Sequence, residues 1–193
     1  METQLLPASD ITDLRLQRGR NVLVIGGRAV IRQLQVLAAS LALTRRVHIL
    51  DGGNCLEPYL LAAEIRRLGQ DPHVYLQNIT TTRAFSSVQF RSMALKAAES
   101  FNPGGDTVYF VLDMLLTFYD ESLPQSESRR LLGLSLQSLL EIGKEAPLVV
   151  QAKPLNQPGG HKTAVFEQLR RAFPNALAEY GQSNPAPTQP GLF

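Results

Sequence analysis

The sequence is poor in cysteine and in aromatic side chains: it has one cysteine and no tryptophan in 193 residues. A single cysteine, Cys55, excludes an internal disulfide and a zinc site made of several cysteines. Low cysteine use is typical of the reducing cytoplasm, where we expect this protein. The net charge is only +2, so any nucleic-acid binding must depend on a local patch of charge.

Long apolar segments are also missing. No apolar run approaches the roughly 20 residues that a helix needs to cross a bilayer. The first ten residues lack a basic region followed by an apolar one, so we expect no signal peptide. The three histidines are far apart in the sequence and lack the spacing of metal ligands.

Short apolar runs that alternate with helical patterns dominate the chain from residue 20 onward. We predict strands at 22–25, 46–50, 77–82, 107–112 and 148–151. We predict helices at 29–43, 56–68, from Ser86 or Ser87 to 101, at 126–143 and at 163–173. This alternation predicts an α/β fold with a parallel sheet covered on both faces, and ligands at the carboxyl ends of the strands. We expect one domain over residues 20–180, after an N-terminal extension (1–19) and before a disordered tail (181–193).

A glycine turn follows the first predicted strand and has the layout of a phosphate-binding loop. The pattern G-x-x-x-x-G-K-[ST] begins at Gly26-Gly27. However, Ile31, Arg32 and Gln33 occupy the positions of the second glycine, the lysine and the hydroxyl residue. A working phosphate loop, a weak nucleotide site and a purely structural turn are the three interpretations, and the missing groups favour the structural turn.

A dinucleotide-binding fold is a competing interpretation of the same turn. Asp51 ends the second predicted strand, where a ribose-binding acid would lie. Against this, Arg28 and Ile31 occupy glycine positions of G-x-G-x-x-G and would obstruct a pyrophosphate. Asp113 ends the most apolar predicted strand; it suits an aspartate that assists magnesium, or a residue that caps the next turn.

Three segments resemble the core of RecA-like recombinases, most closely the archaeal and eukaryotic branch: Val47–Pro58, Ala63–Pro72 and Leu76–Ser86. Arg83-Ala-Phe85 is the most specific match, and the resemblance covers about residues 20 to 153. It implies a RecA-like, P-loop NTPase-type three-layer sandwich around a mostly parallel central sheet. It further implies that a degenerate Walker A and Walker B site lies at the following positions: Gly26, Gly27, Arg32, Gln33 and Asp113.

The resemblance also identifies what the chain has lost. Gly53 stands at the position of the family's catalytic glutamate, so we assign no catalytic residue. ATP with magnesium is the family's cofactor, with Asp113 as the only candidate metal ligand, but the lost groups argue against turnover. Cys55 fits a small buried residue better than a nucleophile.

Two further features suggest contacts with partners. The loop after the fifth predicted strand corresponds to a DNA-binding loop of the family, and Lys153, His161 and Lys162 are its candidate DNA contacts; a plain surface loop is the alternative. Phe173 and Ala176 have the F-x-x-A spacing by which RecA-like recombinases dock a neighbouring subunit. The alternative is that Phe173 packs on the sheet.

We therefore expect a catalytically degenerate RecA-like paralogue that assists homologous recombination and DNA repair. Its partner would be a RecA-like recombinase or a paralogue subunit, in a homo- or hetero-oligomer. Two rival functions are an ATP-binding RecA-like ATPase that uses Arg32 and Asp113, and a regulatory RecA-like scaffold without a DNA role. Fold alone does not decide among them.

Overall fold

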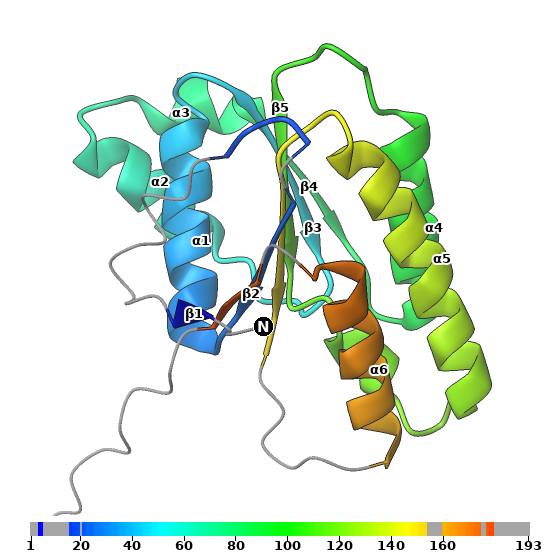
Figure 1. Cartoon of the computed structure of the whole chain (residues 1–193). Helices are drawn as coiled ribbons and strands as arrows, with labels where there is room; N and C mark the ends of the chain where they lie inside the picture. The colour runs from blue at the N-terminus through cyan, green and yellow to red at the C-terminus, as the bar shows by residue number, and fades with distance from the viewer. Residues whose placement is uncertain (1–3, 6–15, 20, 154–159, 175–176, 180–193) are drawn as a thin grey trace, which may run out of the picture.

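The chain folds as an α/β domain with a parallel sheet between two layers of helices (Figure 1). The computed structural model describes residues 4–5, 16–19, 21–153, 160–174 and 177–179. The described strands are β1 (Gln4–Leu5), β2 (Asn21–Ile25), β3 (Arg46–Asp51), β4 (Ile79–Arg83), β5 (Thr107–Leu112), β6 (Leu148–Ala152) and β7 (Leu177–Glu179). The described helices are α1 (Arg28–Leu41), α2 (Pro58–Arg67), α3 (Pro72–Tyr75), α4 (Ser87–Glu99), α5 (Gln125–Gly143) and α6 (Gly160–Ala172), with 3-10 turns η2 (Leu76–Asn78) and η3 (Leu116–Tyr119).

The strand order is β1-β7-β2-β6-β5-β3-β4, and every strand pair is parallel. The strand that leads to Gly26 is therefore separated from the strand that ends at Asp51 by β6 and β5. In a dinucleotide-binding fold the first two strands are neighbours. The strand order thus excludes that interpretation of the glycine turn.

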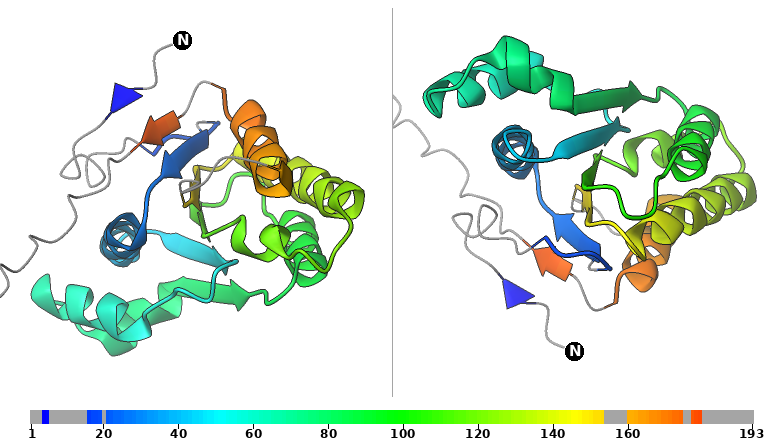
Figure 2. Two further views of the ribbon diagram at one scale, coloured as in Figure 1. Left: turned by 90° about the horizontal axis from the view of Figure 1, so that it is seen from below. Right: turned by 90° about the horizontal axis from the view of Figure 1, so that it is seen from above.

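Helices α1, α2 and α3 lie on one face of the sheet, and α4, α5 and α6 lie on the other (Figure 2). The strands supply both cores because successive side chains point to opposite faces. Leu23 and Ile25 belong to the core under α4–α6, whereas Val22 and Val24 belong to the core under α1 and α2. The central strands are buried on both faces, which explains why they are continuous apolar runs.

The sequence predicted all five main strands and the five long helices, each to within a few residues. It missed β1 and β7, which have two and three residues, and the short α3. The prediction that helices cover both faces of the sheet is wrong for β4, because β4 is an edge strand and Thr80–Arg83 are exposed. The predicted disordered tail lies outside the described residues. Within the part of the chain that is described, no helix combines the length and apolarity needed to cross a membrane.

Candidate functional site

The turn between β2 and α1 is too short to wrap a phosphate. Strand β2 ends at Ile25 and helix α1 begins at Arg28, so only Gly26 and Gly27 connect them. The Gly26 amide donates to the Ala152 carbonyl at 3.0 Å, which ties the turn to β6. A Cβ on Gly26 would lie 2.3 Å from a Val30 methyl. Glycine is required here because the helix packs directly onto the end of the strand.

Three residues aligned with the phosphate loop lie inside α1 instead. Ile31 is 2% exposed and belongs to the helix's buried face. Arg32 points outward and its guanidinium donates to Glu57 at 2.7 Å. The side-chain oxygen of Gln33 is buried and has no hydrogen-bond partner among the described residues. A helical backbone turns its amides away from a common centre, so this segment does not form the cradle of backbone amides that a phosphate loop provides.

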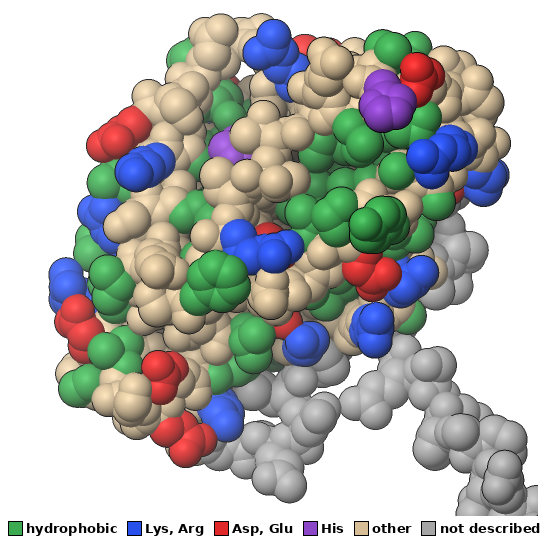
Figure 3. Space-filling view, turned by 180° about the vertical axis from the view of Figure 1, so that it is seen from behind, with side chains coloured by type: hydrophobic (Ala, Val, Ile, Leu, Met, Phe, Trp, Pro, Cys, Tyr) green, Lys and Arg blue, Asp and Glu red, His purple; other side chains and the backbone are tan. Residues whose placement is uncertain are grey.

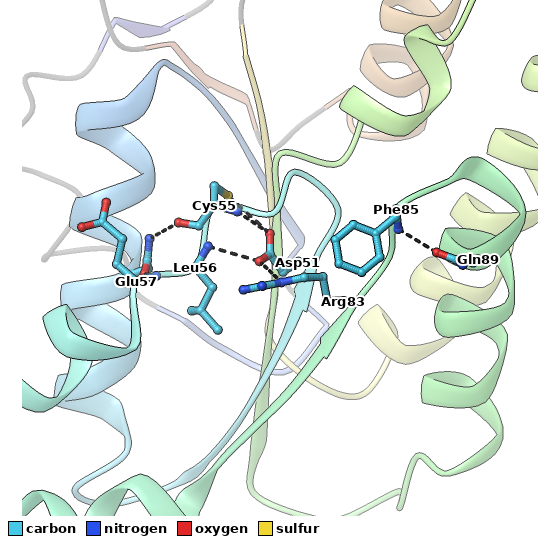
Figure 4. Close-up of polar contacts among 8 residues, drawn as sticks. Asp51, Cys55, Leu56, Glu57, Arg83, Phe85 and Gln89 are labelled. Atoms are coloured by element: carbon cyan, nitrogen blue, oxygen red, sulfur yellow. Dashed lines mark hydrogen bonds and ion pairs between the residues drawn. The ribbon is translucent and has the colours of Figure 1, made fainter. Parts of the chain in front are cut away.

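Asp51, at the end of β3, is the centre of a buried polar network (Figure 4). Its two carboxylate oxygens accept hydrogen bonds from the Cys55 amide at 3.0 Å and the Leu56 amide at 3.1 Å. They also accept from the Arg83 guanidinium at 3.0 Å. The side chain thus closes the turn after β3 and joins it to β4. Such a carboxylate serves structure, because its lone pairs are already occupied.

Gln35 anchors the same turn from the opposite side. It is fully buried in α1, donates to the Cys55 carbonyl at 3.2 Å and accepts from the Glu57 amide at 2.6 Å. This residue was not among the predicted site residues. The signal was present, because Gln35 is a polar residue on the apolar face that Ile31 and Ala38 define.

Asp113 follows β5 in the left-handed region, with φ of +47°. Its carboxylate is 2.5 Å from the Lys153 ammonium. A Cβ on Gly53 would lie 2.3 Å from the Asp113 Cβ, so no larger residue fits at this position without a shift. Gln151 joins the ends of three strands: it accepts from the Asp113 amide and donates to the Gly26 carbonyl, each at 2.7 Å.

The described residues do not fit ATP with magnesium. Lys153 neutralises Asp113 where the metal would bind, and Gln33 supplies no hydroxyl. No group of three or more possible metal-ligating side chains occurs among the described residues. A pocket of about 290 Å³ does lie beside the start of α1, lined by Arg28, Lys153 and Glu57 among others. The pocket thus combines two cations, Arg28 and Lys153, with the carboxylate of Glu57. This carboxylate already forms ion pairs with Arg28 and Arg32.

Cys55 is not an activated nucleophile. Burial, followed by the negative charge of Asp51, raises the pKa of its thiol to about 12. The thiolate is therefore scarce at neutral pH, and the thiolate is the reactive form. This agrees with the expectation that Cys55 is not a nucleophile, although its side chain is only half-buried.

The three candidate DNA contacts each have an internal partner. Lys153 pairs with Asp113, and Lys162 pairs with Glu121 at 3.1 Å. His161 forms a hydrogen bond with the Phe118 carbonyl at 2.9 Å. Residues 154–159, between Lys153 and α6, lie outside the described residues. The candidates thus bracket one loop, and none of them presents an unpaired charge.

The candidate docking motif is only partly described. Phe173 is 3% exposed and lies in the core under α4–α6. Docking of Phe173 on a neighbouring subunit would require the ring to leave this core. The packing alternative accounts for the observed position. Ala176 lies outside the described residues.

A groove opens along the exposed side of β4, and Arg83 at the end of this strand both lines the groove and pairs with Asp51. It has a volume of about 500 Å³ and lies between the edge of the sheet and α4. No sequence pattern indicated this groove, although Arg83 lines it. Phe85 and Val88 are 69% and 57% exposed, and Figure 3, seen from behind Figure 1, shows hydrophobic side chains exposed among polar and basic ones.

The start of α4 is precisely fixed next to this groove. Ser86 caps the helix by accepting from the Gln89 amide at 3.2 Å. The Gln89 side chain accepts from the Phe85 amide at 2.8 Å, a reciprocal arrangement similar to a capping box. The exposed Phe85 ring therefore projects from a well-anchored backbone (Figure 4).

No protein-family model matches the chain, and no curated protein matches it.

Proposed function

We propose that this chain is a RecA-like recombinase paralogue that has lost ATP turnover and acts as an accessory, partner-binding subunit in homologous recombination and DNA repair. The resemblance centred on Arg83-Ala-Phe85 supports the family, and a parallel sheet covered by helices is compatible with it. The observation that carries the proposal is the closed carboxyl edge: α1 begins at Arg28, and Asp113 is neutralised by Lys153.

A partner-binding role is supported by the contrast between the carboxyl ends of the strands and the outer edge of β4. At the carboxyl edge, Asp51, Glu57 and Asp113 all bind groups of the same chain. At the edge of the sheet, apolar side chains are exposed, and the outer side of β4 pairs with no further strand among the described residues. Exposed strand edges and apolar patches mark sites where another chain adds to a sheet.

Affinity co-purification from the native host, followed by mass spectrometry, tests this function. We expect a RecA-like recombinase or paralogue to be recovered with the wild-type chain and lost with Val88→Glu, which places a charge on the groove. Tyr59→Ala is the matched control, because Tyr59 is 91% exposed and does not line the groove. Recovery of no recombinase by the wild-type chain would overturn the proposal. Gel-shift with single- and double-stranded DNA, at stated salt, separates a DNA-repair role from a regulatory scaffold.

The pocket beside α1 favours one second candidate, an ATP-binding protein with an unorthodox site. Arg28 and Lys153 line this pocket, and the first amides of a helix attract anions. Calorimetric titration with Mg-ATP, in the wild type and in Arg32→Ala, decides between the two functions. We expect no saturable binding in either protein. Tight binding that is lost in the variant would replace the accessory function with this second one.

A further inference from the structure

The groove beside β4, which we call the β4 groove, has basic groups on both of its walls. Arg83 and His48 come from the sheet, and Lys96 comes from α4. No aspartate or glutamate lines it among the described residues. Burial lowers the pKa of His48, so the positive charge comes from Lys96 and from the terminal nitrogens of Arg83, whose Nε is paired with Asp51. The groove is therefore electrostatically matched to a negatively charged occupant.

Arg83 is oriented for such a contact. Its Nε donates to the buried Asp51 carboxylate, which fixes the plane of the guanidinium. Its two terminal nitrogens have no hydrogen-bond acceptor among the described residues, and the side chain is 36% exposed. A guanidinium held at Nε can still bind a second carboxylate through its terminal nitrogens. Asp51 is thus a positioning residue for Arg83.

Lys96 is the second cationic group of the groove. It has no ion pair with any described residue, whereas Lys144, Lys153 and Lys162 each have one. Apolar side chains of the same helix, Met93 and Ala97, line the groove with it. Carboxylate-binding groups therefore lie next to an apolar surface.

The neighbouring strand determines the shape of the occupant. β4 is the last strand of the sheet, and its outer backbone groups face no other described strand. An extended segment can pair with this edge and place every second side chain over the groove. From these observations we propose that the β4 groove binds an extended segment of a partner protein in which acidic and apolar residues alternate on one face. Arg83 and Lys96 bind the carboxylates. This proposal rests on the partner-binding function above and specifies the chemistry of the partner.

Fluorescence anisotropy with three labelled heptapeptides tests the proposal on the full chain. All three have threonine at odd positions and valine at the central position. The second and sixth positions are glutamate in the first peptide, glutamine in the second and lysine in the third. We expect the glutamate peptide to bind about fivefold tighter than the glutamine peptide, and more tightly still than the lysine peptide. High salt should reduce this preference.

Variants assign the preference to the groove. Lys96→Gln changes an exposed residue and should weaken glutamate-peptide binding about two- to fivefold, with no effect on the glutamine peptide. Lys144→Gln is the matched control, since Lys144 does not line the groove. Arg83→Gln should remove most of the preference; its circular dichroism spectrum reports whether the fold survives, and Lys96→Gln remains decisive if it does not.

The outcomes separate this proposal from the proposed function. Equal binding of all three peptides would overturn the acidic preference and leave the partner-binding groove in place. A preference unchanged in Lys96→Gln, or equally reduced in Lys144→Gln, would also overturn it. Absence of binding by every peptide would overturn the inference, whereas the accessory function would still be judged by whether a recombinase co-purifies.

Discussion

Asp51→Asn tests whether the contacts of this carboxylate stabilise the fold at the carboxyl ends of the strands. The Asp51 side chain is 1% exposed and accepts from two backbone amides and from Arg83. An asparagine has one acceptor oxygen, so its amide group must face at least one of these donors. The substitution also removes the negative charge beside Arg83. The turn after β3 and the contact to β4 should weaken together.

The expected magnitude follows from these contacts. A buried hydrogen bond to a charged group contributes about 1.5–3 kcal/mol, and breaking a fully buried ion pair costs about 3–5 kcal/mol. Arg83 is partly exposed, so water recovers part of its loss. We expect the free energy of unfolding to fall by about 3 kcal/mol, or a Tm lower by roughly 6–12 °C for a domain of this size.

Urea unfolding followed by circular dichroism measures this change, with the slope m as a check that unfolding remains two-state. Asp106→Asn is the matched control, because Asp106 is 65% exposed and its carboxylate is 3.6 Å from Arg45. It should cost less than about 1 kcal/mol. Equal losses in the two variants would refute the argument that Asp51 holds this edge.

Three further predictions concern residues near the same edge. Gly53→Ala should lower the free energy of unfolding by about 1–3 kcal/mol in urea titrations, because its Cβ would meet Asp113. The control Gly27→Ala, whose Cβ meets nothing within 4 Å, should change the free energy of unfolding by less than about 0.5 kcal/mol. A larger loss in Gly27→Ala than in Gly53→Ala would contradict the packing. The pKa of the Cys55 thiol is raised to about 12. This thiol should therefore react with iodoacetamide at pH 8 roughly a thousandfold more slowly than in the urea-unfolded chain, where an ordinary thiol pKa of about 8.5 applies. Similar rates in the folded and unfolded chains would show that the thiol is exposed or activated. This raised thiol pKa adds stability below about pH 8.5 that is lost as the pH rises toward 12. Ser86→Ala removes the cap of α4 and should cost about 1 kcal/mol by the same unfolding assay, and no loss would mean that the cap contributes nothing in solution.

The sequence predicted the main elements well because their patterns are strong. The strands before Gly26 and Asp113 are short apolar runs, and their burial on both faces leaves no competing periodicity. The lengths of α1, α4 and α5 were predictable for a similar reason, since each helix has a wide apolar face. Strand order, by contrast, depends on how the crossovers pack, and no local pattern in the sequence encodes it.

The candidate site was predicted only in part. Gly26, Asp51 and Asp113 were identified because they end strands, and parallel strands bring such residues to one edge. Their contacts were not. Gln35 donates to the carbonyl of Cys55, 20 residues later in the chain, and Gln151 accepts from the amide of Asp113, 38 residues earlier; such pairings arise only in the fold. The β4 groove was missed because an edge strand differs from a central one by its neighbours, and the threonines of β4 suit either place.

The buried amide of Gln151 places a strict limit on what this position tolerates. One side chain donates to the strand on one side and accepts from the strand on the other, at two contacts of equal length. Glutamate would set an acceptor against the Gly26 carbonyl, leucine would leave both backbone groups unpaired, and asparagine is one methylene too short to span them. We therefore expect saturation mutagenesis of position 151 to return glutamine alone among the well-folded variants.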